Sequence, residues 1–149
     1  MEANNSIRKM KETDRQEVLA MMRVFYASPA VSTNGSEEIF GRDFDYCIDM
    51  FPYLEGYVFE QENIICGYSM LAKGFSTEVG KACIWIEDIY IKPEYRSLGI
   101  GRHFFEFLKA EYPDVLFKLE VEEENTKAVQ MYEKTGFSKL PYMVMVMEG

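Results

Sequence analysis

Apolar and polar residues follow one another along the chain in patterns that predict both helices and strands. Residues 6–10 predict a short strand, and apolar residues at helical spacing then continue to about residue 26. Ser36 can cap a second helix, whose apolar residues again recur about one turn apart. Two apolar runs flank Gln61, Glu62 and Asn63, an arrangement typical of a β-hairpin.

The second half of the chain alternates strands with helices. The pattern predicts strands at 82–91, 116–121 and 139–147, and helices at about 99–112 and 125–135. The last of these strands, KLPYMVMVM, contains Pro141, which could kink it. The resulting order, β-α-α-β-β-β-α-β-α-β, predicts an α/β (α+β) fold with a mixed sheet flanked by helices.

Length and composition indicate a single globular domain over residues 1–149. Apolar residues make up 48% of the chain and aromatic residues 15%. No apolar run is long enough to span a membrane, and the first fourteen residues contain no apolar signal-peptide core. Three widely spaced cysteines fit reduced thiols better than a disulfide framework. These features favour a cytoplasmic protein without a membrane partner.

Charge and histidine content exclude two further classes of protein. The formal net charge is −9, whereas a nucleic-acid-binding protein normally carries a basic face. His103 is the only histidine, so a multi-histidine metal site is excluded and no metal is expected. We therefore expect neither a nucleic-acid partner nor a metal cofactor.

The loop between strand 82–91 and the following helix carries the pattern Arg96-x-x-Gly99-x-Gly101. Backbone N–H groups at such a strand-to-helix junction point toward one spot, where the helix dipole favours an anion. A Walker loop would need Lys after its last glycine, and the dinucleotide fingerprint would need a third glycine where Phe104 stands. The loop is therefore either an anion site of another kind or a plain turn.

Two longer segments favour an anion site over a plain turn. IEDIYIKPEYRSLGIGRHFFEFL, followed by LEVEEENTKAVQMYEKTGF, resembles the GNAT superfamily of N-acetyltransferases. The resemblance covers the whole chain in element order and is most specific over residues 84–137. It implies a GNAT-like, mostly antiparallel sheet of 6–7 strands with about four helices, and it implies acetyl-CoA as the cosubstrate.

The resemblance also implies cofactor-binding residues. In this family the glycine loop holds the pyrophosphate of acetyl-CoA, and the preceding strand offers backbone groups to the pantetheine arm. An asparagine contacts the arm, and a tyrosine lies near the sulfur. In this sequence these positions are Arg96, Ser97, Leu98, Gly99, Ile100 and Gly101 in the loop, Ile89 and Ile91 in the strand, and Asn125 and Tyr132 in the last helix.

Acyl transfer to an amine needs a proton acceptor and a proton donor. Tyr132 follows Asn125 by two helical turns, so both can face one cleft, and Tyr132 could protonate the leaving thiolate. The base could be Glu87, Glu120 or a water chain. Strand alternation puts Glu87 on one face and Ile84, Ile86 and Asp88 on the other, which favours Glu87 in the cleft. A cross-strand salt bridge remains the alternative for Glu87.

The acceptor is less defined than the cosubstrate. Residues 30–62 hold eight acidic side chains against Arg42 alone, an excess that would attract a cationic amine such as a polyamine, an aminoglycoside or a lysine-like compound if it faced the cleft. A solvated acidic surface is the alternative. Acetylation of protein N-termini or lysines and a non-catalytic acyl-CoA-binding domain also remain open. Only thirteen residues follow Gly136, so a homodimer could complete the acceptor site.

Overall fold

The computed structural model describes residues 5–31, 35–49 and 51–149, and over these residues five strands form one mixed sheet. Neighbouring strands are antiparallel except the last two, which run parallel. The order across the sheet follows the sequence. The strands are β1 (Asn5–Lys9), β2 (Leu54–Gln61), β3 (Ile64–Ser76), β4 (Lys81–Ile91) and β5 (Leu116–Leu119).

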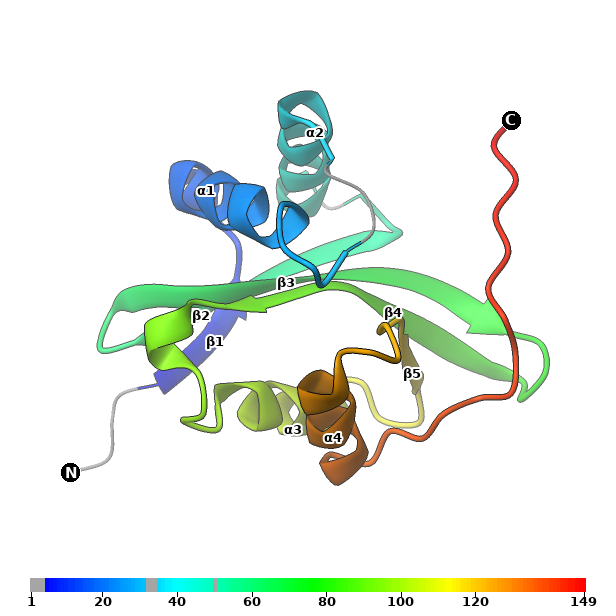
Figure 1. Ribbon diagram of the computed structural model, residues 1–149. Helices are drawn as coiled ribbons and strands as arrows, with labels where there is room; N and C mark the ends of the chain where they lie inside the picture. Colours follow the sequence, from blue (N-terminus) through cyan, green and yellow to red (C-terminus); the bar gives the residue numbers. More distant parts are fainter. Residues whose placement is uncertain (1–4, 32–34, 50) are drawn as a thin grey trace.

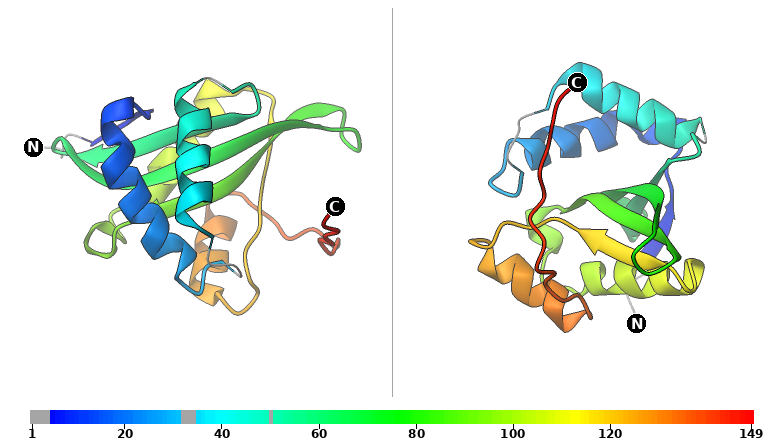
Figure 2. Two further views of the ribbon diagram at one scale, coloured as in Figure 1. Left: turned by 90° about the horizontal axis from the view of Figure 1, so that it is seen from above. Right: turned by 90° about the vertical axis from the view of Figure 1, so that its right-hand side faces the viewer.

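Two helices cover each face of the sheet (Figure 1). Helices α1 (Arg15–Tyr26) and α2 (Glu37–Ile48) lie on one face, and α3 (Ile100–Glu111) and α4 (Thr126–Lys134) lie on the other. Short 3₁₀ turns, η1 (Glu12–Asp14) and η2 (Pro93–Tyr95), precede α1 and the glycine loop. Figure 2 shows the same layering from two further directions. The helix positions agree with those that the periodicity predicts.

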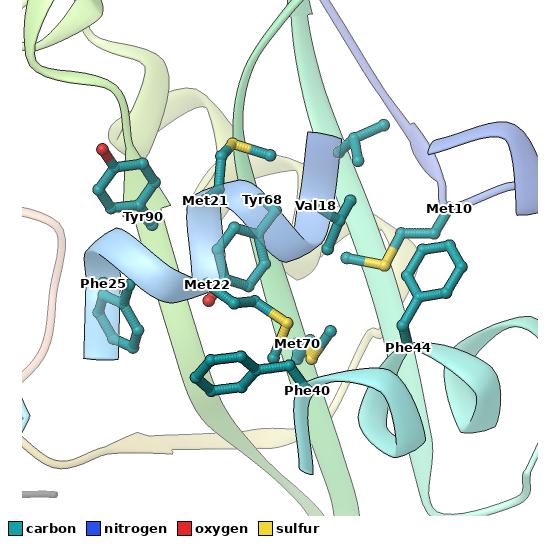
Figure 3. Packing of buried hydrophobic residues seen from close by; sticks show 11 residues of the cluster. Met10, Val18, Met21, Met22, Phe25, Phe40, Phe44, Tyr68, Met70 and Tyr90 are labelled. Atoms are coloured by element: carbon teal, nitrogen blue, oxygen red, sulfur yellow. The ribbon is translucent and has the colours of Figure 1, made fainter. Parts of the chain in front are cut away.

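The sheet separates two apolar cores. On one face, α1 turns its buried residues at helical spacing, among them Met22 and Phe25, toward Phe44 of α2 and Tyr68 of β3 (Figure 3). On the other face, Phe104 of α3 is fully buried against Phe59 of β2 and its neighbours. Burial of such a side chain contributes roughly 1.5–3 kcal/mol. These two cores hold α1 and α3 in place on either side of β4.

The hairpin between β2 and β3 turns at the predicted place. Glu62 and Asn63 have φ angles of 52° and 66°, and the strands pair up to Gln61 and Ile64. Two consecutive residues with positive φ are typical of the type I′ turn, whose twist matches that of a two-residue hairpin. The predicted hairpin is confirmed.

Strand β4 contains a bulge at Glu87 that overturns one sequence-based expectation. Met70 pairs with Asp88 and Leu71 with Ile86, so Glu87 has no partner of its own across the ladder. The extra residue reverses the alternation. Ile86 packs in the core with α3, whereas Asp88 faces α1 on the opposite side of the sheet. The prediction that these two residues share a face is therefore wrong.

The predicted strand at 139–147 is wrong as well. Residues 138–149 form no strand, so the sheet of the described residues has five strands and not the 6–7 that were expected. A strand needs a neighbour for its N–H and C=O groups. Among the described residues, no recorded backbone hydrogen bond involves a residue after Phe137. The alternating pattern is present, but the chain does not bring it to a sheet edge.

Candidate active site

Strands β4 and β5 separate halfway along β4. Their parallel pairing runs from Cys83–Leu116 to Ile86–Leu119, whereas β4 continues to Ile91. Beyond Ile86 the edge of β4 that faces away from β3 has no strand beside it among the described residues. This separation opens a cleft between the two strands.

Backbone groups of Ile89 and Ile91 face this opening. The N–H of Lys92 donates to the carbonyl of Cys66 at 2.8 Å, and the carbonyl of Asp88 accepts from the hydroxyl of Ser69 at 2.7 Å, so residues 88 and 92 turn their backbone toward β3. The N–H and C=O groups of residues 89 and 91 therefore point to the other side of β4, away from β3. The Ile91 carbonyl accepts a hydrogen bond from Nε of Arg96 at 2.8 Å. The N–H groups of Ile89 and Ile91 are therefore placed to pair with an extended ligand.

The cleft has a volume of about 350 Å³ and brings together five of the predicted site residues. Its lining residues come from the end of α1 and the loop after it, from β4, from the end of β5 and the segment that follows, and from α4 with its cap. The predicted residues that line it are Ile89, Glu87, Glu120, Asn125 and Tyr132. Ile91 and residues 96–101 lie outside this cavity, at the end of β4 and the start of α3.

The loop before α3 has the geometry of an anion site. Ser97 and Gly99 have φ angles of 65° and 83°, and Gly99 is the N-cap residue of α3. A Cβ on Gly99 would meet nothing within 4 Å, so the space beside its Cα is open. The first N–H groups of a helix lack intrahelical partners. A Cβ on Gly101 would instead face inward, 3.6 Å from Met131 and 3.7 Å from Ile91.

Two predicted residues also have structural roles. The side-chain oxygen of Asn125 caps α4 by accepting a hydrogen bond from the N–H of Ala128 at 3.4 Å. This contact leaves the side-chain NH₂ group of Asn125 for another partner. The guanidinium of Arg96 lies 5.6 Å from the centre of the Tyr90 ring. Ile100 is buried in the core and can serve the loop only through its backbone, whereas Leu98 is 59% exposed.

Tyr132 is held in the cleft wall by two aromatic contacts. Its ring centre lies 6.0 Å from that of Phe105 and 5.9 Å from that of Phe137, both in edge-to-face geometry. Burial raises the pKa of Tyr132 above its ordinary value of about 10. At neutral pH its hydroxyl therefore keeps its proton and can act as a donor.

Glu87, on β4, and Glu120, just after β5, both line the cleft. Partial burial raises the pKa of Glu87, and the charges of Glu120 and Asp88 raise it further. A raised pKa improves a carboxylate as a proton acceptor near neutral pH. No salt bridge is recorded for Glu87 among the described residues, so the alternative of a cross-strand pair finds no support.

A second cavity of about 240 Å³ shares Tyr26 and Glu87 with the first. Asp43 and Asp88 also line it, and the Asp88 carboxylate accepts hydrogen bonds from the hydroxyls of Tyr26 and Tyr68 at 2.7 and 2.8 Å. Burial raises the pKa of Asp88 to about 6, although the two tyrosines oppose this, and burial also raises the pKa of Asp43. Asp43 is one of the eight acidic residues of 30–62 that were expected near the acceptor, whereas Tyr26 was not predicted to lie at the site.

Most of the acidic excess in residues 30–62 lies outside both cavities. Five of the eight acidic side chains form ion pairs elsewhere: Glu37 with Arg23, Glu38 with Arg42, Asp45 with Arg15, Glu55 with Lys73 and Glu60 with Arg8. Asp43 is the member of the set that lines a cavity. Of the eight acidic residues, Asp43 therefore remains as a candidate for contact with a cationic acceptor. Glu87 and Asp88 of β4 lie at the same cavity.

The described residues offer neither a metal-ligand cluster nor a membrane-spanning helix. Across residues 5–31, 35–49 and 51–149, no group of three or more His, Cys, Asp or Glu side chains is arranged to hold a metal ion. In the same residues no helix combines the length and the apolar character that crossing a membrane requires.

Comparison with known proteins identifies the family. Residues 19–137 match the model of the acetyltransferase (GNAT) family. The chain is 32% identical to thialysine N-epsilon-acetyltransferase of Sus scrofa over 141 residues, which cover 87% of this chain and 82% of that protein. It is 28% identical to the protein of the same name from Mus musculus, covering 93% and 86%.

Solved structures share the fold. A structure described as a possible acetyltransferase from Clostridium difficile 630 superimposes with a TM-score of 0.81 at 17% identity, covering 97% of each chain. Aminoglycoside N-acetyltransferase AAC(6')-Iy in complex with CoA gives a TM-score of 0.77 at 11% identity, covering 99% of this chain and 97% of that one. The chain therefore belongs to the GNAT family of acetyltransferases and is an acyltransferase enzyme.

Proposed function

We propose that the enzyme is a single N-acetyltransferase domain over residues 1–149 that moves an acetyl group from acetyl-CoA to a primary amine by direct attack in a ternary complex. The observation that carries the proposal is the cleft between β4 and β5, which places Tyr132 and two carboxylates around one open strand edge. The relatives named as thialysine N-epsilon-acetyltransferases support an amine acceptor.

The residues at the cleft fit acetyl-CoA. The loop from Arg96 to Gly101 would hold the pyrophosphate through N–H groups at the start of α3, and the open space at Gly99 gives an anion access to them. The N–H of Ile91 would donate to an amide carbonyl of the pantetheine arm, as an added strand does, and the N–H of Ile89 would face the thioester. Asn125 would contact the arm. Acetyl-CoA supplies the activated acetyl group and a thiol leaving group.

Each catalytic group would then handle one proton or one developing charge. The base that frees the amine is Glu87, Glu120 or a water held by them, and the raised pKa of Glu87 favours Glu87. The N–H of Ile89 can stabilise negative charge on the thioester oxygen. Tyr132, protonated at neutral pH, can donate its proton to the leaving sulfur.

The second cavity is the proposed place of the acceptor. It meets the first at Glu87, so an amine held there can reach the acyl carbon. Asp43, Glu87 and Asp88 line it without a basic side chain among the lining residues. Like charges gathered in a partly buried space favour a cationic occupant. The proposed acceptor is therefore a small cationic amine, such as a polyamine, an aminoglycoside or a lysine-like compound.

An amine panel tests both the activity and the acceptor class. CoA release is measured with lysine-like, polyamine, aminoglycoside, neutral and anionic amines and with peptides bearing a free N-terminus. Asp43→Asn is expected to lower kcat/KM for the preferred cationic amine about tenfold, because a charge-assisted hydrogen bond contributes roughly 1.5–3 kcal/mol, and to change the neutral amine less than about twofold.

Glu38→Gln is the matched control for Asp43→Asn, because Glu38 lies on the same helix but pairs with Arg42 on the surface. It should leave all rates within about twofold. A preference for an anionic amine or for a peptide N-terminus, or an equal effect of the two substitutions, would rule out the cationic pocket.

Leu98 offers a test of the phosphate site that spares the fold. Its side chain is largely exposed, so Leu98→Glu removes little packing and brings a carboxylate next to the bound pyrophosphate. The Kd for CoA, measured by calorimetry, is expected to rise about tenfold at low salt and less at high salt. Leu98→Gln, which has a similar shape but no charge, should bind normally. Equal affinities of the two variants would refute the site.

A further inference from the structure

Asp88 is a buried carboxylate without a cationic partner. Its side chain is 2% exposed, and in the part of the chain that the structure describes no ion pair is recorded for it. A buried carboxylate is costly unless its oxygens are hydrogen-bonded. The hydroxyls of Tyr26 and Tyr68 meet this need, because they donate to its two oxygens at 2.7 and 2.8 Å. A charged group kept in such surroundings points to a role beyond packing.

The two tyrosines come from different elements. Tyr26 ends α1, whereas Tyr68 is a fully buried residue of β3 that packs with the core residues of α1 (Figure 3). Burial and the charge of Asp88 raise the pKa of both hydroxyls, so each keeps its proton and remains a donor. The backbone of Asp88 is held as well, because its carbonyl accepts a hydrogen bond from the hydroxyl of Ser69 at 2.7 Å. Asp88 therefore joins β4 to both α1 and β3 at one point.

This junction lies immediately beside the bulge of β4. Glu87 is the residue that the bulge leaves unpaired, and it is exposed in the cleft, whereas Asp88 is buried. A bulge next to an active site re-aims a side chain, but it also disrupts the ladder locally, so the ladder does not hold the extra residue. The three hydrogen bonds to Asp88 supply that restraint one residue away from Glu87.

We propose that Asp88 is a positioning residue: through Tyr26 and Tyr68 it fixes the bulge of β4 and thereby turns Glu87 into the cleft. Both of its carboxylate oxygens are engaged by hydroxyls, so its role is to orient a neighbour and not to transfer a proton. The inference rests on the proposed function, in which Glu87 faces the acceptor amine, and deepens it by naming the residue that sets the orientation of Glu87. Tyr68 lines neither cavity, so its hydroxyl acts on the site through Asp88.

Tyr68→Phe tests this chain of contacts without touching the cavities. The substitution removes one hydroxyl and keeps the ring contacts with Phe25 and Tyr90. We expect kcat to fall about tenfold, since a displaced catalytic group is costly, while KM for the amine stays within about twofold. In the Glu87→Gln background the same substitution should lower kcat less than about twofold, because the group that it displaces is already lost. An equal loss in both backgrounds would show a merely structural role and overturn the proposal.

Two substitutions of Asp88 separate its geometry from its charge. An asparagine amide has the same shape and can bond both hydroxyls, so Asp88→Asn should keep kcat within about threefold. Asp88→Ala bonds neither hydroxyl and should lose at least as much kcat as Tyr68→Phe. Tyr57→Phe is the control for the loss of a buried hydroxyl, because Tyr57 belongs to the core on the other face of the sheet. A native kcat in Asp88→Ala, or an equally slow Asp88→Asn, would overturn the proposal.

Titration of Glu87 by carboxyl NMR reports its placement without any turnover. The titratable groups around it, none of which Tyr68→Phe changes, are Tyr26, Asp43, Asp88, Glu120, Glu122 and Tyr132. Burial raises the pKa of Glu87, so a side chain that leaves the cleft for solvent should titrate closer to the ordinary value of about 4.3.

The NMR result distinguishes the placement of Glu87 from its role as the base. A lower midpoint in Tyr68→Phe than in the native protein supports the proposal even if Glu87→Gln keeps its turnover, a result that would refute only the proposed role of Glu87 as the base. An unchanged midpoint in Tyr68→Phe would overturn the proposal, whatever the amine panel shows.

Discussion

Turnover is expected to fall about 10²-fold or more when Tyr132 is replaced by phenylalanine, while the affinity for acetyl-CoA stays within about twofold. Proton-transfer groups contribute typically 10²–10⁴-fold to a rate. The substitution removes only the hydroxyl and keeps the edge-to-face contacts of the ring with Phe105 and Phe137. A loss of packing therefore cannot account for the effect. Steady-state rates of CoA release and calorimetric titration with CoA provide the two measurements.

A matched control separates catalysis from the general effect of losing a buried hydroxyl. Tyr57 is also buried, and its hydroxyl lies 2.9 Å from that of Tyr112, remote from the residues that line the cleft. Tyr57→Phe should lower the melting temperature without lowering turnover. If Tyr132→Phe retains more than about a third of the native turnover, the thiolate must take its proton from another source, such as water.

The fold was largely predictable because its signals are local. Three polar residues between two apolar runs predict the β2–β3 hairpin, and the helical spacing of buried residues such as Met22 predicts α1. The start of α3 at the glycine loop is another local signal, and Gly99 caps this helix with a positive φ that glycine adopts without strain. These features depend on residues within a few positions of one another.

The two wrong predictions depend instead on residues that are far apart in the sequence. The bulge at Glu87 depends on the register between β3 and β4, which alternation within β4 alone cannot reveal. The strand at 139–147 has the right pattern, but a strand forms only where an edge is available to it. In both cases the missing information is a partner distant in the sequence.

The second cavity, proposed as the acceptor site, was predicted only as a general acidic excess over residues 30–62, although periodicity could have placed it more closely. Asp43 lies three residues after Phe40 on α2, so both share the helix face that turns toward the sheet. Periodicity alone could have separated Asp43 from the acidic residues of the solvent-facing side, such as Glu38. Asp88 could not have been placed this way, because the bulge decides which face it takes.

Substitution of the catalytic base is expected to have the second largest effect on the rate. The pH dependence of kcat/KM shows which carboxylate is the base. If Glu87 is the base, Glu87→Gln should lower kcat/KM about 10²-fold and flatten the acidic limb of the pH profile. In the native enzyme the midpoint of that limb should lie above the ordinary glutamic acid value of about 4.3, since burial and the charge of Glu120 raise the pKa of Glu87.

Glu120→Gln is the informative partner of this experiment, because the two candidate bases then predict opposite results. With Glu87 as the base, this variant keeps the acidic limb and moves its midpoint to lower pH, since it removes a negative charge that disfavours ionisation of Glu87. With Glu120 as the base, the limb flattens in Glu120→Gln and persists in Glu87→Gln. The same acceptor amine serves for all variants, so its own titration is common to every profile. An acidic limb unchanged in both variants would exclude both carboxylates and leave a water chain to carry the proton.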